Sequence, residues 1–208
     1  MAPNVADLVR LILVTDDELL RGRDLVAICR AAERGGVTSV QLRLKRATPR
    51  ELAEHARALG TALRIPVLVN DRADVALSCG AAGVHLGPED VPGPLVRTIA
   101  PAGFVIGASV GDEAEAEAGR AADYWGIGPY RATGTKTDAG VPLGPARLAE
   151  ITRWSEGRPC VAIGGVTPED VPDVLAAGAV GVAVVSGILD APDVEAAARR
   201  YAEALARH

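Results

Sequence analysis

An excess of positive charge is missing from this 208-residue chain. Lys and Arg together number 22 against 27 Asp and Glu, which gives a formal net charge of −5. No global basic field exists to attract nucleic acid or an anionic membrane, so neither is expected as a partner. Any anionic ligand must be held by a local group of residues.

Cysteine and long apolar segments are also scarce. Cys29, Cys79 and Cys160 are an odd number, lie far apart and do not have metal-ligand spacing, so we expect buried thiols in a reducing compartment. No segment reaches transmembrane length, and residues 1–14 carry acidic Asp7 where a signal peptide would be basic. These absences predict a soluble, cytoplasmic protein.

The chain has instead a repeated joint between helix and strand. Four similar segments place small residues suited to a helix C-terminus before a short apolar run: 35–40, 80–85, 121–126 and 178–183. Hydrophobic residues make up 49% of the chain, and most strand-length runs are continuous rather than alternating, as in parallel strands buried on both faces. The expected strands are 11–14, 38–44, 66–70, 83–86, 104–108, 123–127, 160–163 and 181–185. Eight strands alternating with helices predict an α/β fold, a single-domain (β/α)8 TIM barrel over residues 1–208.

Helix starts fit the same scheme. Thr48 and Thr167 each precede a proline and an acid, the pattern of a capped helix, and Asp112 and Asp190 are expected to cap helices likewise. The one long irregular connection, 128–144, is rich in Gly, Thr and charge. Connections of this length in compact domains are usually functional or disordered.

Polar residues and glycines follow the apolar runs, and a parallel barrel collects all its strand ends on one face. Asp71 closes the third strand and Asp90 follows the fourth, so two carboxylates are expected at neighbouring points of the rim. A pair of oxygen ligands completed by water and phosphate suits Mg²⁺. Helix capping by both residues is the equally weighted alternative, and Glu89 is a weaker candidate.

Two cations follow the second strand. Gln41, Arg43 and Lys45 alternate along the strand, so all three side chains are predicted to point to the same face. Two cations facing a barrel interior would be costly to bury without an anion, which favours anion binding there. A solvated sheet edge is the alternative.

Glycines and hydroxyls gather in three later loops. Gly165 follows the seventh strand and Ser186 the eighth, and the loops at these positions of a barrel commonly hold a phosphate. Thr133-Gly134-Thr135-Lys136 is suited to wrapping a phosphate, although it lacks P-loop spacing. Tight turns alone would also explain the glycines.

Covalent catalysis is not indicated. His85 lies in a strand and is interpreted as a hydrogen-bonded core histidine rather than a catalytic one. No Ser-His-Asp or Cys-His arrangement can be assembled from the remaining residues.

Taken together, these motifs resemble the thiamine-phosphate synthase family. The likeness runs in order from about residue 11 to 206 and is carried by Val40-Gln-Leu-Arg-Leu-Lys45, Val69-Asn-Asp-Arg72, Gly83-Val-His-Leu-Gly-Pro-Glu-Asp90, Gly126-Ile-Gly-Pro129 with Thr133-Gly-Thr-Lys136, and Ala162-Ile-Gly-Gly165. The chain departs from the family pattern at Gly111, where members often carry His, at Tyr130-Arg131-Ala132, and at Pro88.

The resemblance implies a (β/α)8 barrel that joins 4-amino-2-methyl-5-hydroxymethylpyrimidine diphosphate to 4-methyl-5-hydroxyethylthiazole phosphate and releases pyrophosphate. It implies loss of pyrophosphate before the thiazole nitrogen attacks, so leaving-group stabilisation by Arg43, Lys45, Lys136, Ser109 and Mg²⁺ replaces a protein nucleophile. It also implies three groups of ligands: Gln41, Arg43, Lys45, Asn70, Ser109 and Lys136 for the pyrimidine diphosphate; Thr133, Gly134, Thr135, Gly165, Val185 and Ser186 for the thiazole phosphate; Asp71 and Asp90 for Mg²⁺.

Two other functions compete with this one. A thiazole tautomerase-like isomerase shares the barrel, and a non-catalytic barrel could bind thiamine precursors. The Asp pair and the Thr-x-Thr-Lys segment favour the synthase over both. The expected partners are two small phosphorylated substrates, and a homo-oligomer is left open.

Overall fold

The computed structural model describes residues 4–132 and 141–207. Within these ranges eight parallel strands close into a barrel in sequence order, with β1 paired to β8. The strands are β1 (Leu11–Val14), β2 (Ser39–Leu42), β3 (Val67–Asn70), β4 (Gly83–Leu86), β5 (Val105–Ser109), β6 (Tyr124–Ile127), β7 (Cys160–Ile163) and β8 (Gly181–Val184). The fold prediction and all eight strands are confirmed. The largest difference is at β2, which ends at Leu42 rather than at residue 44.

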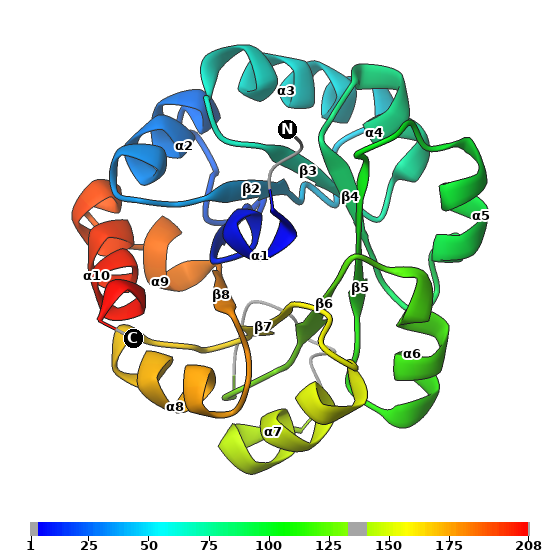
Figure 1. Cartoon of the computed structure of the whole chain (residues 1–208). Coiled ribbons are helices and arrows are strands. Elements are labelled where there is room, and N and C mark those ends of the chain that lie inside the picture. The colour runs from blue at the N-terminus through cyan, green and yellow to red at the C-terminus, as the bar shows by residue number, and fades with distance from the viewer. Residues whose placement is uncertain (1–3, 133–140, 208) are drawn as a thin grey trace.

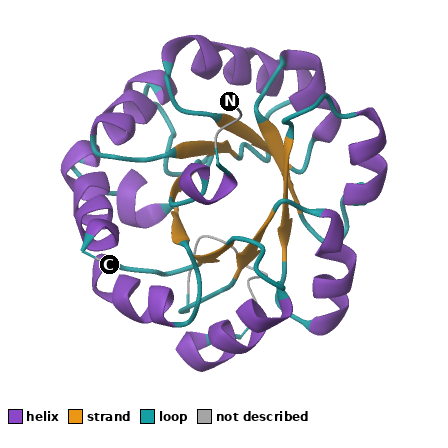
Figure 2. Cartoon of the chain, viewed as in Figure 1, coloured by secondary structure: helices purple, strands orange, loops and turns teal. Residues whose placement is uncertain are grey.

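Helices surround the strands as an outer ring (Figures 1 and 2). In the described residues they are α1 (Val5–Leu8), α2 (Leu25–Arg34), α3 (Pro49–Ala62), α4 (Ala73–Cys79), α5 (Gly93–Ile99), α6 (Glu113–Ala118), α7 (Gly144–Trp154), α8 (Val171–Ala176), α9 (Ser186–Leu189) and α10 (Val194–Ala206), with 3-10 turns η1 (Gly119–Ala121) and η2 (Pro168–Asp170).

The predicted helix starts are confirmed at three of four positions. Thr48 and Thr167 form capping boxes, and the Asp112 side chain accepts a hydrogen bond from Glu115 N at 2.9 Å. Asp190 is wrong as an N-cap because it lies at the C-terminal end of α9. The next helix is capped by Asp193, whose carboxylate accepts from Ala196 N at 2.9 Å.

The strands contribute side chains to two separate apolar clusters. Side chains that point inward, such as Ile12, Leu68 and Val161, fill the barrel, and those that point outward pack under the helices. Leu8 and Val9, in and just after α1, join the inner cluster. Figure 1 shows α1 over the middle of the strand ring, so α1 closes the barrel at the N-terminal ends of the strands. The C-terminal ends form the opposite, open mouth.

Two of the three cysteines are buried as expected. Burial raises the pKa of Cys29 to about 12 and that of Cys160 to about 11, which makes both thiols unreactive. Cys79 is only partly buried, because it ends α4 near the surface. In residues 4–132 and 141–207, no helix has the length and hydropathy needed to cross a bilayer.

Candidate active site

Asp71 and Asp90 lie together at the barrel mouth. Asp71 follows β3 in the left-handed region, with φ 64°, and its N–H donates to the His85 carbonyl of β4 at 2.8 Å. The Asp90 carboxylate accepts from Gly87 N at 2.6 Å. The capping alternative is wrong for both, because the N-caps of α4 and α5 are Arg72 and Pro92.

Asp90 makes ionisation of Asp71 more costly. Burial, the charge of Asp90 and a hydrogen bond with Asp90, in that order, raise the pKa of Asp71 to about 6. Lys45 and Arg43 act in the opposite direction, so both cations are close enough for their charges to be felt at Asp71. A half-buried pair of like charges is an arrangement that a bound cation relieves. Among the described residues no group of three or more His, Cys, Asp or Glu could hold a metal. Two protein carboxylates, with the remaining ligands from water and substrate, are a ligand set that suits Mg²⁺.

Arg43 and Lys45 reach this region by a route other than the one predicted. Since β2 ends at Leu42, strand alternation does not orient them, and that part of the prediction is wrong. Arg43 is held by the loop after β1: its guanidinium lies 3.0 Å from the Asp16 carboxylate, and its N–H donates to Thr15 Oγ1 at 2.8 Å. The loop also fixes the next turn, because Lys45 N donates to the Asp17 carboxylate at 2.7 Å.

The sequence reasoning missed Thr15, Asp16 and Asp17. They are the polar residues that directly follow β1, a strand end for which the sequence analysis predicted no function. Their effect is to position the two cations beside the Asp pair.

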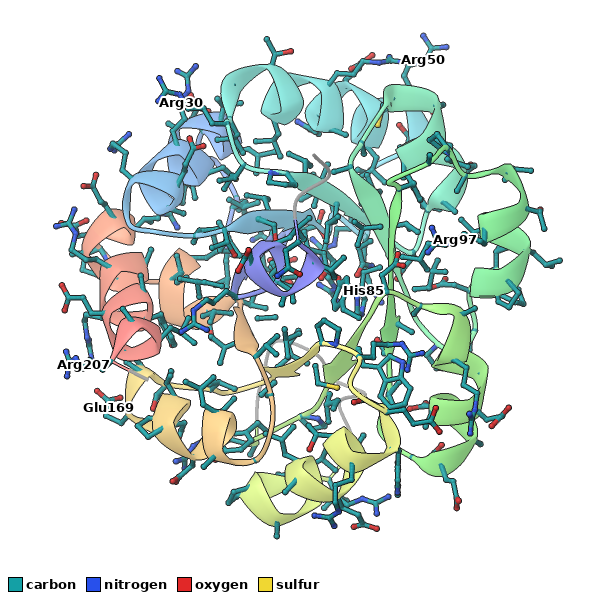
Figure 3. All side chains as sticks on the ribbon, viewed as in Figure 1. Arg30, Arg50, His85, Arg97, Glu169 and Arg207 are labelled. Atoms are coloured by element: carbon teal, nitrogen blue, oxygen red, sulfur yellow. The ribbon has the colours of Figure 1, made fainter. Side chains whose placement is uncertain are left out.

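Hydrogen-bonded polar side chains of neighbouring strands line the barrel interior near its mouth. Gln41 donates to Asn70 Oδ1 at 2.7 Å, linking β2 to β3. His85 contacts Ser109 Oγ at 3.1 Å and Tyr124 Oη at 2.9 Å, linking β4 to β5 and β6. Figure 3 shows His85 inside the strand ring. The interpretation of His85 as a hydrogen-bonded core histidine is confirmed.

A second small site lies between the loops after β7 and β8. Gly165, Val185 and Ser186 line one cavity of about 30 Å³. Gly165 has φ 69°, and a Cβ there would lie 2.9 Å from the Cβ of Arg131 in the loop after β6, so the close packing of the loops after β6 and β7 requires glycine. Three of the predicted thiazole phosphate ligands are thus brought together.

The loop after β6 is tied to the loop after β7. Arg131 N donates to the Gly164 carbonyl at 2.9 Å, and its Nε donates to the buried Asp170 carboxylate at 2.8 Å. Thr133, Gly134, Thr135 and Lys136, all predicted to contact substrate, lie outside the described residues.

A larger cavity of about 290 Å³ lies beside the mouth. It is mostly apolar and lies between the ends of β4 and β5 and the helices α5 and α6. Asp90 and Ser109 both line it. The cavity therefore has one residue of the Asp pair and one residue of the polar network in its lining.

Comparison with known proteins identifies what this arrangement is similar to. Residues 11–188 match the family model described as thiamine monophosphate synthase. The thiamine-phosphate synthase of Methanoculleus marisnigri is 47% identical over 201 residues, covering 94% of this chain and 95% of the relative. That of Methanospirillum hungatei is 43% identical over 199 residues, covering 93% and 96%. The solved structure of thiamine phosphate pyrophosphorylase from Pyrococcus furiosus superposes with a TM-score of 0.88 at 36% identity, covering 98% of both chains.

Proposed function

The chain belongs to the thiamine monophosphate synthase family and has thiamine-phosphate synthase activity, and on that premise we propose how its residues carry out the reaction. The substrates are 4-amino-2-methyl-5-hydroxymethylpyrimidine diphosphate and 4-methyl-5-hydroxyethylthiazole phosphate. The carbon–oxygen bond between the pyrimidine methylene and the diphosphate breaks, and a carbon–nitrogen bond to the thiazole forms. The diphosphate leaves with the bonding electron pair.

The diphosphate is held at the Asp pair. The observation that carries this assignment is the placement of Asp71 and Asp90 after the adjacent strands β3 and β4, with Arg43 and Lys45 close enough for their charges to act on Asp71. Mg²⁺ bound by Asp71 and Asp90 would neutralise charge that develops on the leaving diphosphate. Arg43 and Lys45 add fixed positive charge at the same place, and Asp16 keeps the Arg43 guanidinium oriented.

The pyrimidine ring and the second phosphate occupy neighbouring parts of the mouth. Gln41 and Asn70 present amide groups to the pyrimidine, and their mutual hydrogen bond of 2.7 Å fixes the orientation of both. The thiazole phosphate is held by backbone N–H groups of the loops at Gly165, Val185 and Ser186. Lys136 and the Thr133–Thr135 segment complete the two anion sites in this proposal.

The free thiols agree with the cytoplasmic location that forms part of the proposal. The expected partners are the two phosphorylated small molecules.

A coupled assay tests the function and its metal requirement. Purified protein with both substrates and Mg²⁺ is expected to form thiamine phosphate and pyrophosphate in equal amounts. Chelation with EDTA should lower the rate at least about 100-fold, and added Mg²⁺ should restore it, because leaving-group charge is then neutralised again. Full activity in EDTA would contradict the role of the Asp pair. Isomerisation of the thiazole without joining would contradict the reaction itself.

Substitution of Gly165 by Ala tests the second phosphate site. The new Cβ would collide with Arg131 and displace the loop after β7, which carries Gly165, so the KM for the thiazole phosphate should rise about 10-fold or more while the KM for the pyrimidine diphosphate changes little. Gly80→Ala is the matched control: Gly80 has φ 71°, close to the 69° of Gly165, but a Cβ added there would have no atom within 4 Å. Both variants should lose similar backbone stability, and only Gly165→Ala should affect substrate binding. Equal KM values in the two variants would remove Gly165 from the site.

A further inference from the structure

A buried chain of three hydrogen-bonding side chains runs beneath the proposed site. The Tyr124 hydroxyl lies 2.9 Å from His85 Nδ1, and His85 Nε2 lies 3.1 Å from Ser109 Oγ. Tyr124 has no exposed surface and His85 is 8% exposed. The residues come from β6, β4 and β5, and the strand register places Gly107 opposite both His85 and Tyr124. The absence of a side chain at Gly107 lets the two rings meet.

The hydrogen bonds that link Tyr124, His85 and Ser109 run in one direction. Burial raises the pKa of Tyr124 well above its ordinary value, so the phenol keeps its proton. Among the described residues, the hydrogen-bond partner of this hydroxyl is His85 Nδ1. When His85 is neutral, the phenol proton is donated to Nδ1, which is then the unprotonated nitrogen of the imidazole. The imidazole proton is in that case on Nε2 and is donated to Ser109 Oγ.

This order is the reverse of a hydrolytic triad. In a Ser-His-Asp triad a carboxylate accepts from Nδ1–H, which leaves Nε2 free to take the serine proton. Here a phenol donor stands where the carboxylate would be. His85 does not act as a base toward Ser109, and the Ser109 hydroxyl proton is directed away from His85. Ser109 and Asp90 line the same cavity, which places Ser109 beside the proposed diphosphate site.

We propose that Tyr124 is a positioning residue that acts through His85 to make Ser109 a hydrogen-bond donor to an oxygen of the departing diphosphate. The identity of that acceptor rests on the proposed function, whereas the tautomer of His85 does not. An oxygen that gains negative charge as the carbon–oxygen bond breaks accepts this bond more strongly in the transition state than in the bound substrate. The proton stays on Ser109, and no covalent bond of the three side chains changes.

The tautomer is measured by ¹⁵N NMR on protein labelled at histidine. The chain has three histidines, so the His85 signals are assigned by comparison with His85→Gln. At a pH where the imidazole is neutral, Nε2 should carry the proton and Nδ1 should not. Tyr124→Phe removes the donor and should give a mixture of tautomers. Tyr201→Phe is the control, because it removes another buried phenol, one that donates to the Val166 carbonyl at 2.9 Å, and should leave the His85 signals unchanged. A proton on Nδ1 in the unmodified protein overturns the proposal, whether or not the protein forms product and whether or not the variants fold.

A double-mutant cycle tests the connection to catalysis. Tyr124→Phe should lower kcat about 10-fold with less than about a 2-fold change in either KM, since only the orientation of the Ser109 hydroxyl is lost. In a Ser109→Ala background the same substitution should lower kcat less than about 2-fold further. Independent losses that multiply in the double variant would show that Tyr124 does not act through Ser109. A protein that shows the expected tautomer but makes no thiamine phosphate would contradict the proposed function and the assigned acceptor, leaving only the hydrogen-bond order.

Discussion

Substitution of Asp71 by Asn should lower the rate of thiamine phosphate formation by about 10²–10³-fold and, in the absence of metal, make the protein more stable. The rate falls because one of the two proposed Mg²⁺ ligands loses its charge, an electrostatic loss of the size seen when a key stabilising group is removed. The gain in stability follows from the raised pKa of Asp71, which is about 6 in the folded protein against an ordinary value of 3.8.

The sign of this stability effect can be worked out from the two pKa values. Between pH 3.8 and about 6 the folded protein binds more protons at Asp71 than the unfolded chain does, so this residue's contribution to stability falls as the pH rises through that window. Above about pH 6 the full cost is present, and Asn removes it. Because Asp71 is only half-buried, solvent screens part of the cost, and we expect a rise in Tm of about 2–4 °C at pH 8 in EDTA, with little difference near pH 4.

Thermal unfolding from pH 4 to 8 in EDTA, together with the coupled assay, measures both effects. Asp74→Asn is a suitable control because Asp74 lies three residues away, and its pKa is lowered rather than raised, chiefly by its hydrogen bond with Arg72. That variant should keep its activity and should not gain stability. An Asp71→Asn protein that is inactive but less stable than the original at pH 8 would show that the two carboxylates do not repel each other as described.

Substitution of Gly107 by Ala should damage both the fold and the reaction. A Cβ at this position would lie 2.3 Å from Tyr124 Cζ and 2.6 Å from His85 Nδ1, inside the contact distance of two rigid, buried rings. Overpacking of a filled core costs about 1–3 kcal/mol, which corresponds to a fall in Tm of roughly 2–12 °C in a domain of this size. Because the rings must separate, their hydrogen bond breaks and the Ser109 hydroxyl loses its orientation, so kcat should fall at least about 10-fold.

Gly60→Ala is the matched control for this substitution. Gly60 lies in α3, has no atom within 4 Å of an added Cβ and does not have a positive φ. There Ala should raise stability by about 0.5–1 kcal/mol, since it lowers the entropy of the unfolded chain and favours helix. Circular dichroism melts and steady-state kinetics of the two variants give the comparison. Unchanged Tm and kcat in Gly107→Ala would contradict the packing of Tyr124 against His85.

Local sequence patterns were enough for the architecture. The β-strands and the helix caps at Thr48 and Thr167 depend on residues close together in sequence, where runs of Val and Leu, prolines and capping hydroxyls act directly on the backbone. The position of the Asp pair also follows from strand order alone, because Asp71 and Asp90 come after adjacent strands. Only the burial of Asp71, and hence its raised pKa, required the three-dimensional structure.

The features that the sequence did not reveal depend on register between distant segments. In the sequence, Tyr124 cannot be distinguished from the apolar residues of β6. Its contact with His85, 39 residues earlier, forms because the register of β4, β5 and β6 places Gly107 between the two rings. The orientation of Arg43 depends on Asp16, 27 residues away. The alternation of residues along β2 does not show that the strand ends at Leu42. It also does not show that the loop after β1 binds the residues that follow.

The short helix α1 determines the side from which substrates can enter the barrel. With Leu8 and Val9 plugged into the bottom, both substrates must arrive, and both products must depart, through the same mouth. A shared entrance makes the order of substrate binding matter, because a substrate bound near the mouth blocks access to a site deeper in the barrel. The substrate that binds deeper must therefore enter first, and both products must leave through the mouth before the next pair of substrates can bind.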